Sequence, residues 1–191
     1  MNISELISNL SRGKGVSESE IKDVSEQLEL LVSDEKLLKR VSHDDLYDLT
    51  LALSKADAKD SSHLLEKLLP FSDSITKSLL IKTLYEQWGK TDEAMGDLIN
   101  WSTEENDEVK EASISALICY VAKFVPDSSR VKDIDKLDID ITANLNAAVN
   151  AIIESDSEFL KSDYFLDPFL KYFPNEQDPL QYLTSIKSAL S

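Results

Sequence analysis

Apolar residues recur every three or four positions along most of the chain, which is the spacing of amphipathic helices. No segment shows the strict alternation of a convincing β-strand. Residues 131–141 do alternate, but their many aspartates disfavour a strand. The segments expected to be helical are 3–10, 17–32, 44–53, 64–69, 73–88, 91–101, 107–124, 145–153, 159–173 and 178–190.

Several of these segments carry helix-boundary signals. Ser17 with Glu20 forms a capping-box pattern, and Asp73 and Asp107 are suited to cap the helices that follow them. Asp178 and Pro179 occupy N-cap and N1 positions of a final helix. Further boundary residues are Gly13 and Gly15, Ser42 or Asp44, Pro70, Gly89, Pro126 and Pro168, the last of which is expected to interrupt its segment.

The helical pattern repeats along the chain. Asp73-Ser74-Ile75 aligns with Asp107-Glu108-Val109 at an offset of 34 residues, and Asp44-Asp45-Leu46 aligns with the first of these at an offset of 29. Each unit reads as a short apolar helix, a turn, an Asp cap and a longer helix. One such pair cannot bury both apolar faces alone, whereas stacked pairs share a continuous core.

The segment from Asp107 to Leu117, DEVKEASISAL, resembles the second helix of a HEAT-type repeat. That pattern has an Asp, an aliphatic residue, a basic residue, then small residues and Ala-Leu. The resemblance covers roughly 42–124, and the units at 73–84 and 44–55 match less well. It implies a right-handed α-solenoid that binds other proteins and has no chemistry of its own.

The whole chain is therefore expected to be one all-α domain, 1–191. Its expected parts are N-terminal helices in 1–41, HEAT-like hairpins in 42–124, a connection in 125–140 and C-terminal helices in 141–191. Seven of the twelve Phe and Tyr residues fall within 159–182, which favours an aromatic C-terminal capping region. With only four Gly and five Pro, tight turns are few and an all-β fold is disfavoured.

The formal charge of −16 limits the possible partners. It disfavours nucleic acids and anionic membranes, which bind clustered Lys and Arg. It favours a basic protein partner, although acidity that only supports solubility remains an alternative. The N-terminus lacks a basic region followed by a long apolar run, so a cytoplasmic location is expected.

Negative charge is concentrated in 133–167, a segment that contains nine acidic residues and two lysines. A second acidic stretch lies at 104–111. Tyr164 and Tyr172 are the aromatic residues expected to be exposed, and tyrosine is common at interface hot spots. The expected partner-binding residues are Asp133, Asp135, Asp138, Asp140, Glu154, Asp156, Glu158, Asp163, Tyr164, Tyr172, Glu104, Glu105, Glu108 and Glu111.

Catalytic, cofactor and metal sites are not indicated. Cys119 lies in an apolar helix and reads as a small buried residue. His43 and His63 read as surface or capping residues. The aspartates of 133–140 lack the Gly and Glu positions of an EF-hand loop, and the Arg12–Gly15 stretch lacks the spacing of a phosphate-binding loop.

Three functions are compatible with these features. A compact, strongly acidic chain with one cysteine is similar in general character to bacterial immunity proteins, which neutralise toxins such as nucleases. That resemblance implies occlusion of a basic active site by carboxylates. The alternatives are a scaffold or adaptor of a larger complex, and an enzyme on a HEAT-like framework, which the acidic charge disfavours.

Overall fold

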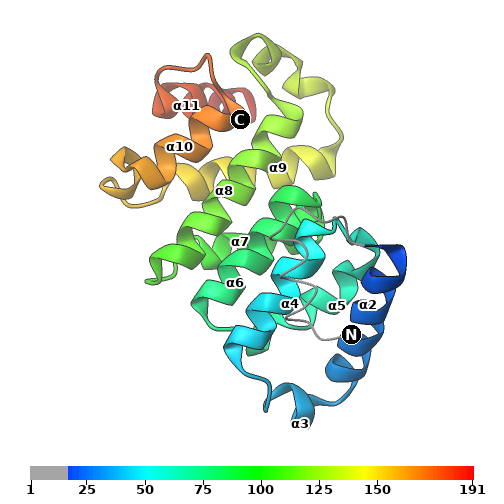
Figure 1. Ribbon diagram of the computed structural model, residues 1–191. Helices are drawn as coiled ribbons and strands as arrows, with labels where there is room; N and C mark the ends of the chain where they lie inside the picture. Colours follow the sequence, from blue (N-terminus) through cyan, green and yellow to red (C-terminus); the bar gives the residue numbers. More distant parts are fainter. Residues whose placement is uncertain (1–16) are drawn as a thin grey trace. The chain divides into compact units, whose positions relative to one another are not determined.

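The computed structural model describes residues 17–191 (Figure 1). Every regular element in this range is a helix, so the predicted all-α class is confirmed for the described part of the chain. The predicted stripe Ile3–Leu10 and the turn around Gly13 and Gly15 lie outside the described residues. The chain divides into two compact units: unit 1 is Met1–Leu84 and unit 2 is Tyr85–Ser191.

Unit 1 packs its helices around leucine side chains. Helix α2 contacts α3, α4 and α5, and α4 also contacts α6. Leu28, Leu46, Leu53 and Leu65 are fully buried where these helices meet. The elements of unit 1 are α2 (Glu18–Ser33), α3 (Glu35–Leu38), α4 (His43–Lys55), η1 (Lys59–Ser61), α5 (Ser62–Glu66), η2 (Leu69–Phe71) and α6 (Ser74–Ile81).

Local capping sets where these helices begin. Ser17 and Glu20 form the predicted capping box on α2. The side chain of Ser42 caps α4 by accepting from the backbone N–H of Asp45, and Asp73 caps α6 by accepting from Thr76. These contacts pair backbone donors that a helix start otherwise leaves unsatisfied.

A π-helix, η3 (Lys82–Gln87), follows α6 directly. Gly89, with a φ of 74°, lies two residues after it and adopts the left-handed conformation that favours glycine. The single helix predicted over 73–88 is therefore an α-helix that continues as a π-helix.

Helix α8 is the centre of unit 2. Ten of its eighteen residues are buried, and α7, α9 and α10 all contact it. Helix α11 contacts α9 and η5. The elements of unit 2 are η4 (Thr91–Ala94), α7 (Met95–Trp101), α8 (Asp107–Phe124), η5 (Ser128–Lys136), α9 (Ile139–Ile153), η6 (Phe159–Lys161), α10 (Asp163–Tyr172) and α11 (Pro179–Ala189).

The C-terminal aromatic residues form a continuous cluster. Phe165 and Phe169 of α10 and Phe173, the residue that caps its C-terminal end, are all buried. The ring centres of Phe169 and Phe173 lie 4.8 Å apart. Tyr182 of α11 packs edge-on against Phe173, and its hydroxyl donates to the backbone carbonyl of Val125 at 2.7 Å. The aromatic cluster thus joins α10 and α11 to the end of α8.

Four expectations need correction. Helix α8 is capped by Asn106, whose side chain accepts from the N–H of Val109, and Asp107 is its first helical residue. The connection over 125–140 contains the 3₁₀-helix η5. Pro168 lies inside α10 without interrupting it, because the buried phenylalanines hold the helix in place. Tyr172 is half-buried rather than exposed, because its hydroxyl binds Glu86.

Candidate functional site: an acidic groove

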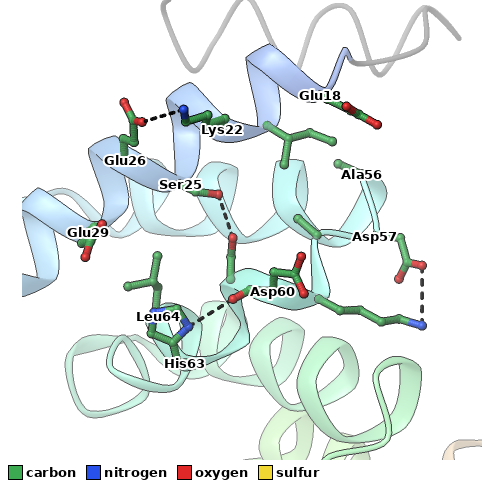
Figure 2. A pocket seen from close by; sticks show the side chains of 14 residues that line it. Glu18, Lys22, Ser25, Glu26, Glu29, Ala56, Asp57, Asp60, His63 and Leu64 are labelled. Carbon is green, nitrogen blue, oxygen red and sulfur yellow. Dashed lines mark hydrogen bonds and ion pairs between the residues drawn. The ribbon is translucent and has the colours of Figure 1, made fainter.

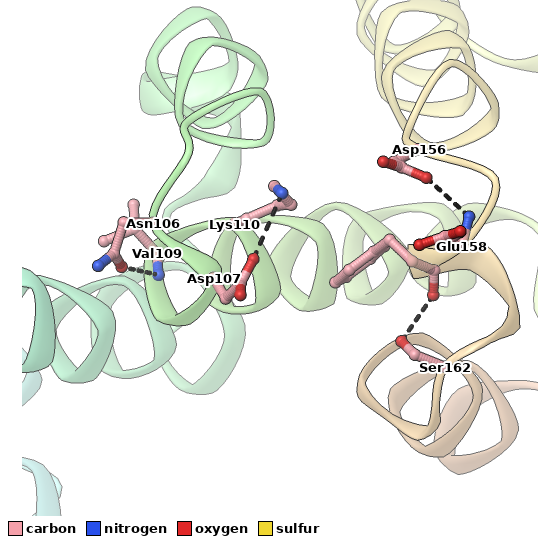
Figure 3. A network of polar contacts seen from close by, with 8 residues as sticks. Asn106, Asp107, Val109, Lys110, Asp156, Glu158 and Ser162 are labelled. Atoms are coloured by element: carbon pink, nitrogen blue, oxygen red, sulfur yellow. Dashed lines mark hydrogen bonds and ion pairs between the residues drawn. The ribbon is translucent and has the colours of Figure 1, made fainter.

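The first turns of α8 lie beside the segment that follows α9 (Figure 3). A surface groove of about 490 Å³ separates them. Both sides of this acidic groove belong to unit 2. Its lining residues are Asp107, Glu108, Lys110, Glu111, Asp156, Glu158, Phe159, Ser162 and Tyr164.

The α8 side of the groove is fixed by the helix start. Asn106 Oδ1 accepts from the backbone N–H of Val109 at 3.0 Å, which sets the direction of the first turn. Asp107 and Glu108 then lie where the positive end of the helix dipole stabilises carboxylates. Glu111 follows Glu108 at a spacing of three residues, which places both on the same side of the helix.

The opposite side is a short, internally bonded segment. Asp156 Oδ1 accepts from the backbone N–H of Glu158 at 2.7 Å, and Ser162 Oγ donates to the carbonyl of Phe159 at 2.7 Å (Figure 3). These bonds hold Asp156 and Glu158 at the end of the segment that faces α8. Tyr164, at the start of α10, is 65% exposed.

The groove combines negative charge with aromatic surface. Its five carboxylates and the single ammonium of Lys110 leave a formal charge of −4 on the lining residues. The Nζ atom of Lys110 lies 3.5 Å from Asp107 and 5.9 Å from the centre of the Phe159 ring. The groove therefore already accommodates one ammonium group between a carboxylate and an aromatic face.

The structure brings together five of the residues selected from the sequence: Glu108, Glu111, Asp156, Glu158 and Tyr164. The selected residues that do not line the groove are Glu104, Glu105, Asp133, Asp135, Asp138, Asp140, Glu154, Asp163 and Tyr172.

The aspartates of 133–140 take part in local structure at and after η5. Asp133 pairs with Lys136 and with Arg130, and the hydrogen bond from Lys136 lowers the pKa of Asp133. Asp138 caps α9 by accepting from the N–H of Asp140 at 2.9 Å. Part of the negative charge that marked 133–167 in the sequence is thus neutralised by its neighbours.

Sequence reasoning missed four lining residues. Asp107 and Lys110 carry a detectable signal, because opposite charges three residues apart on a helix meet on one face. Phe159 and Ser162 carry no such signal, since their position depends on how the chain returns after α9.

A largely buried carboxylate outside the groove was also missed. Glu86 is 13% exposed and accepts from Ser115 Oγ at 2.9 Å, Lys171 Nζ at 2.6 Å and Tyr172 Oη at 2.6 Å. Burial raises the pKa of Glu86, but the hydrogen bonds from Lys171, Tyr172 and Ser115 outweigh it and hold the pKa below its ordinary value.

Cys119 lies next to this carboxylate. Its thiol is half-buried and donates to the backbone carbonyl of Glu86 at 3.7 Å. Burial raises the pKa of the thiol, which disfavours the nucleophilic thiolate. The arrangement supports a packing role for Cys119 and offers no activated nucleophile.

Unit 1 contains a larger cavity, of about 750 Å³, between α2 and the segment 56–64 (Figure 2). Two ion pairs lie in its lining: Lys22 lies 3.7 Å from Glu26, and Lys59 lies 3.6 Å from Asp57. The His63 ring is bonded to the backbone carbonyl of Asp60. The lining of this cavity is also acidic, with five carboxylates and two lysines, but it contains no Phe, Tyr or Trp. It therefore lacks the aromatic surface that the acidic groove offers to a cation.

Within residues 17–191, no group of three or more His, Cys, Asp and Glu side chains is arranged to hold a metal ion. In the same range, no helix combines the length and apolarity needed to cross a bilayer.

No family model, no curated protein and no solved structure matches the chain. The geometry of the acidic groove is therefore the basis on which a function is proposed.

Proposed function

We propose that the chain is a non-enzymatic protein-binding module whose acidic groove receives cationic side chains of a basic partner. The observation that carries the proposal is the meeting of two acidic segments, 107–111 and 156–158, around one groove with aromatic residues in its wall. Each segment alone reads as a solvated acidic stretch. Together they form a concave surface that offers several carboxylates to one cation.

An arginine side chain fits this chemistry best. Its guanidinium group can donate hydrogen bonds to two carboxylate oxygens at once and can also stack on an aromatic ring. Glu108, Glu111 and Glu158 supply carboxylates, and the exposed Tyr164 supplies a ring. The overall charge of −16 would speed the encounter with a basic surface at low salt.

The class of partner proposed is a basic toxin such as a nuclease. A nuclease active site is positively charged because it binds phosphates, so an acidic protein can occupy it in place of the nucleic acid. The mechanism would be steric and electrostatic occlusion, in which carboxylates of the groove meet the Lys and Arg that otherwise bind substrate. This is the role of an immunity protein.

We further propose that the helical hairpins stack as a right-handed HEAT-like solenoid with the aromatic cluster as its C-terminal cap. The 34-residue offset between the α6 and α8 segments supports this arrangement, as do the contacts of α8 with α7 and α9. In such a stack, α8 would display its first turns at an edge while its remaining residues fill the core.

The test is co-expression with the product of the adjoining gene, followed by co-purification and a nuclease assay. Glu108→Gln/Glu158→Gln removes two charges from the groove, and Asp135→Asn/Asp140→Asn removes two charges outside it. Both variants have the same net charge. We expect the groove variant to weaken inhibition at least about tenfold, because it removes charged hydrogen-bond partners, and the control to change it little. Equal loss in both variants would contradict the proposal.

A scaffold or adaptor role is the second candidate, and exposed apolar residues of unit 1 favour it. Leu30 is 70% exposed and Ile75 is 58% exposed, and both lie outside the acidic groove. Binding through such apolar surface would survive high salt, whereas electrostatic association slows as salt rises. A salt titration of the association rate separates the two functions.

A further inference from the structure

Glu86 accepts three side-chain hydrogen bonds from two helices. Ser115 belongs to α8, whereas Lys171 and Tyr172 are the last two residues of α10. Lys171 also lies over the ring of Tyr172, with its Nζ atom 4.8 Å from the ring centre. The carboxylate thus ties the C-terminal end of α10 to the π-helix η3 and to α8.

Helix α10 depends on such tertiary contacts because its own hydrogen bonding is incomplete. Pro168 lies inside the helix and cannot donate to the carbonyl four residues earlier. Ser162, at the N-cap, makes no side-chain capping bond. A ten-residue helix with these two deficits is marginal by itself, so its position is set by the buried phenylalanine face and by Glu86.

The other end of α10 borders the acidic groove. Ser162 and Tyr164 both line it, and α10 is a single element of ten residues, Asp163–Tyr172, whose other end carries Lys171 and Tyr172. A shift at the Glu86 end can therefore reach the groove, because Ser162 and Tyr164 lie only about one to three turns from the residues that Glu86 holds.

We propose that Glu86 is a positioning residue that clamps the C-terminal end of α10 and thereby holds Tyr164 and Ser162 in place in the acidic groove. The link to binding rests on the proposed function, whereas the clamp itself does not. Lys171 and Tyr172 are the two residues of α10 that Glu86 holds.

Cys119 is a built-in reporter of the clamp. It is the only cysteine in the sequence, it lies beside the Glu86 backbone, and it lines the same surface pocket as Tyr172. When α10 leaves Glu86, Tyr172 moves away from the thiol. The rate at which Cys119 reacts with 5,5′-dithiobis(2-nitrobenzoic acid) therefore reports opening of the clamp.

Lys171→Met is the discriminating variant. Lys171 lowers the pKa of Cys119, so its removal alone would reduce the thiolate and slow the labelling. An opened clamp instead predicts faster labelling of Cys119. We expect labelling to rise about fivefold, which corresponds to about 1 kcal/mol in the opening equilibrium. Lys171→Arg retains the cation and should restore the wild-type rate, and Tyr172→Phe should also label faster.

Binding of a fluorescein-labelled hexa-arginine peptide supplies the second readout. Lys171→Met makes the chain more negative, so its overall charge alone would tighten binding. A displaced Tyr164 predicts weaker binding instead, and we expect about a threefold loss. Slower or unchanged labelling overturns the clamp. Faster labelling with unweakened peptide binding overturns the positioning role.

Failure of the proposed function gives a different result. In that case Glu108→Gln/Glu158→Gln and Asp135→Asn/Asp140→Asn bind the peptide equally well. The positioning role then falls with the groove, while the labelling rates of the Lys171 variants still decide whether Glu86 clamps α10.

Discussion

The ammonium group of Lys110 lies 5.9 Å from the centre of the Phe159 ring, so a residue of α8 and a residue of η6 meet across the acidic groove. The Lys110 side chain is only 20% exposed. A partly desolvated cation over an aromatic face is attracted to it by about 1 kcal/mol. Lys110 therefore acts as a resident cation in a groove that we propose receives another.

Removing this resident charge should strengthen cation binding. Lys110→Met keeps much of the aliphatic side chain but changes the lining from −4 to −5. Partly solvated charges at this range contribute about 1 kcal/mol, so the hexa-arginine peptide should bind about threefold to fivefold more tightly. Lys132→Met is the matched control, because Lys132 is exposed and lies outside the groove lining. The same gain in peptide affinity for both variants would mean that the affinity depends only on net charge and not on the groove.

Ionic strength should act mainly on association. Raising salt from about 50 mM to about 500 mM shortens the screening length severalfold, so the association rate of the peptide should fall by about tenfold or more. The dissociation rate should change much less, because groups in contact are screened weakly. Stopped-flow fluorescence measures both rates, and an unchanged association rate would argue against electrostatic steering.

Tyr182→Phe should destabilise unit 2. The variant leaves the Val125 carbonyl without the hydroxyl that donates to it at 2.7 Å. An unsatisfied buried acceptor costs about 1–2 kcal/mol, which corresponds to a fall in melting temperature of about 4 °C. Tyr164→Phe is the control, because Tyr164 is 65% exposed, and its melting temperature should stay within about 1 °C of wild type. Calorimetry measures the melting temperatures of the two variants and of wild type.

Glu86 should contribute to acid sensitivity. Its pKa lies below the ordinary value of 4.5 in the folded protein, so its contribution to stability is present above that value and is lost as the pH falls through the folded pKa. Glu86→Gln should lose about 1–3 kcal/mol of the free energy of unfolding at neutral pH.

Below about pH 4.5 the difference in the free energy of unfolding between wild type and Glu86→Gln should become smaller, because the wild-type carboxylate becomes protonated. Urea unfolding of both proteins at a series of pH values measures this difference. Glu154→Gln, at an exposed carboxylate outside the groove lining, should follow the wild-type curve. A pH-independent difference for Glu86→Gln would contradict this account of the carboxylate.

Local signals predicted the helices well. Ser17 with Glu20, Asp73, and Asp178 with Pro179 all start helices as expected, because a cap depends only on residues within one turn. Asn106 was missed as a cap because Asp107 beside it is also a good capping residue.

Features that depend on tertiary contacts were not predictable in the same way. Pro168 should end a helix, yet burial of Phe165 and Phe169 keeps α10 continuous around it. The two acidic stretches were identified by composition, but their meeting depends on the path of α9, which separates Glu111 from Asp156. The burial of Glu86 likewise follows from the packing of α8 and α10 and leaves no local mark in the sequence.

The most direct test of the acidic groove is an NMR titration of the ¹⁵N-labelled protein with the hexa-arginine peptide. Binding in the groove predicts that the largest amide shift changes cluster in 107–111 and 156–164, and that Glu108→Gln/Glu158→Gln reduces them while Asp135→Asn/Asp140→Asn does not. Shift changes spread over all acidic segments, or centred on 133–140, would contradict the account.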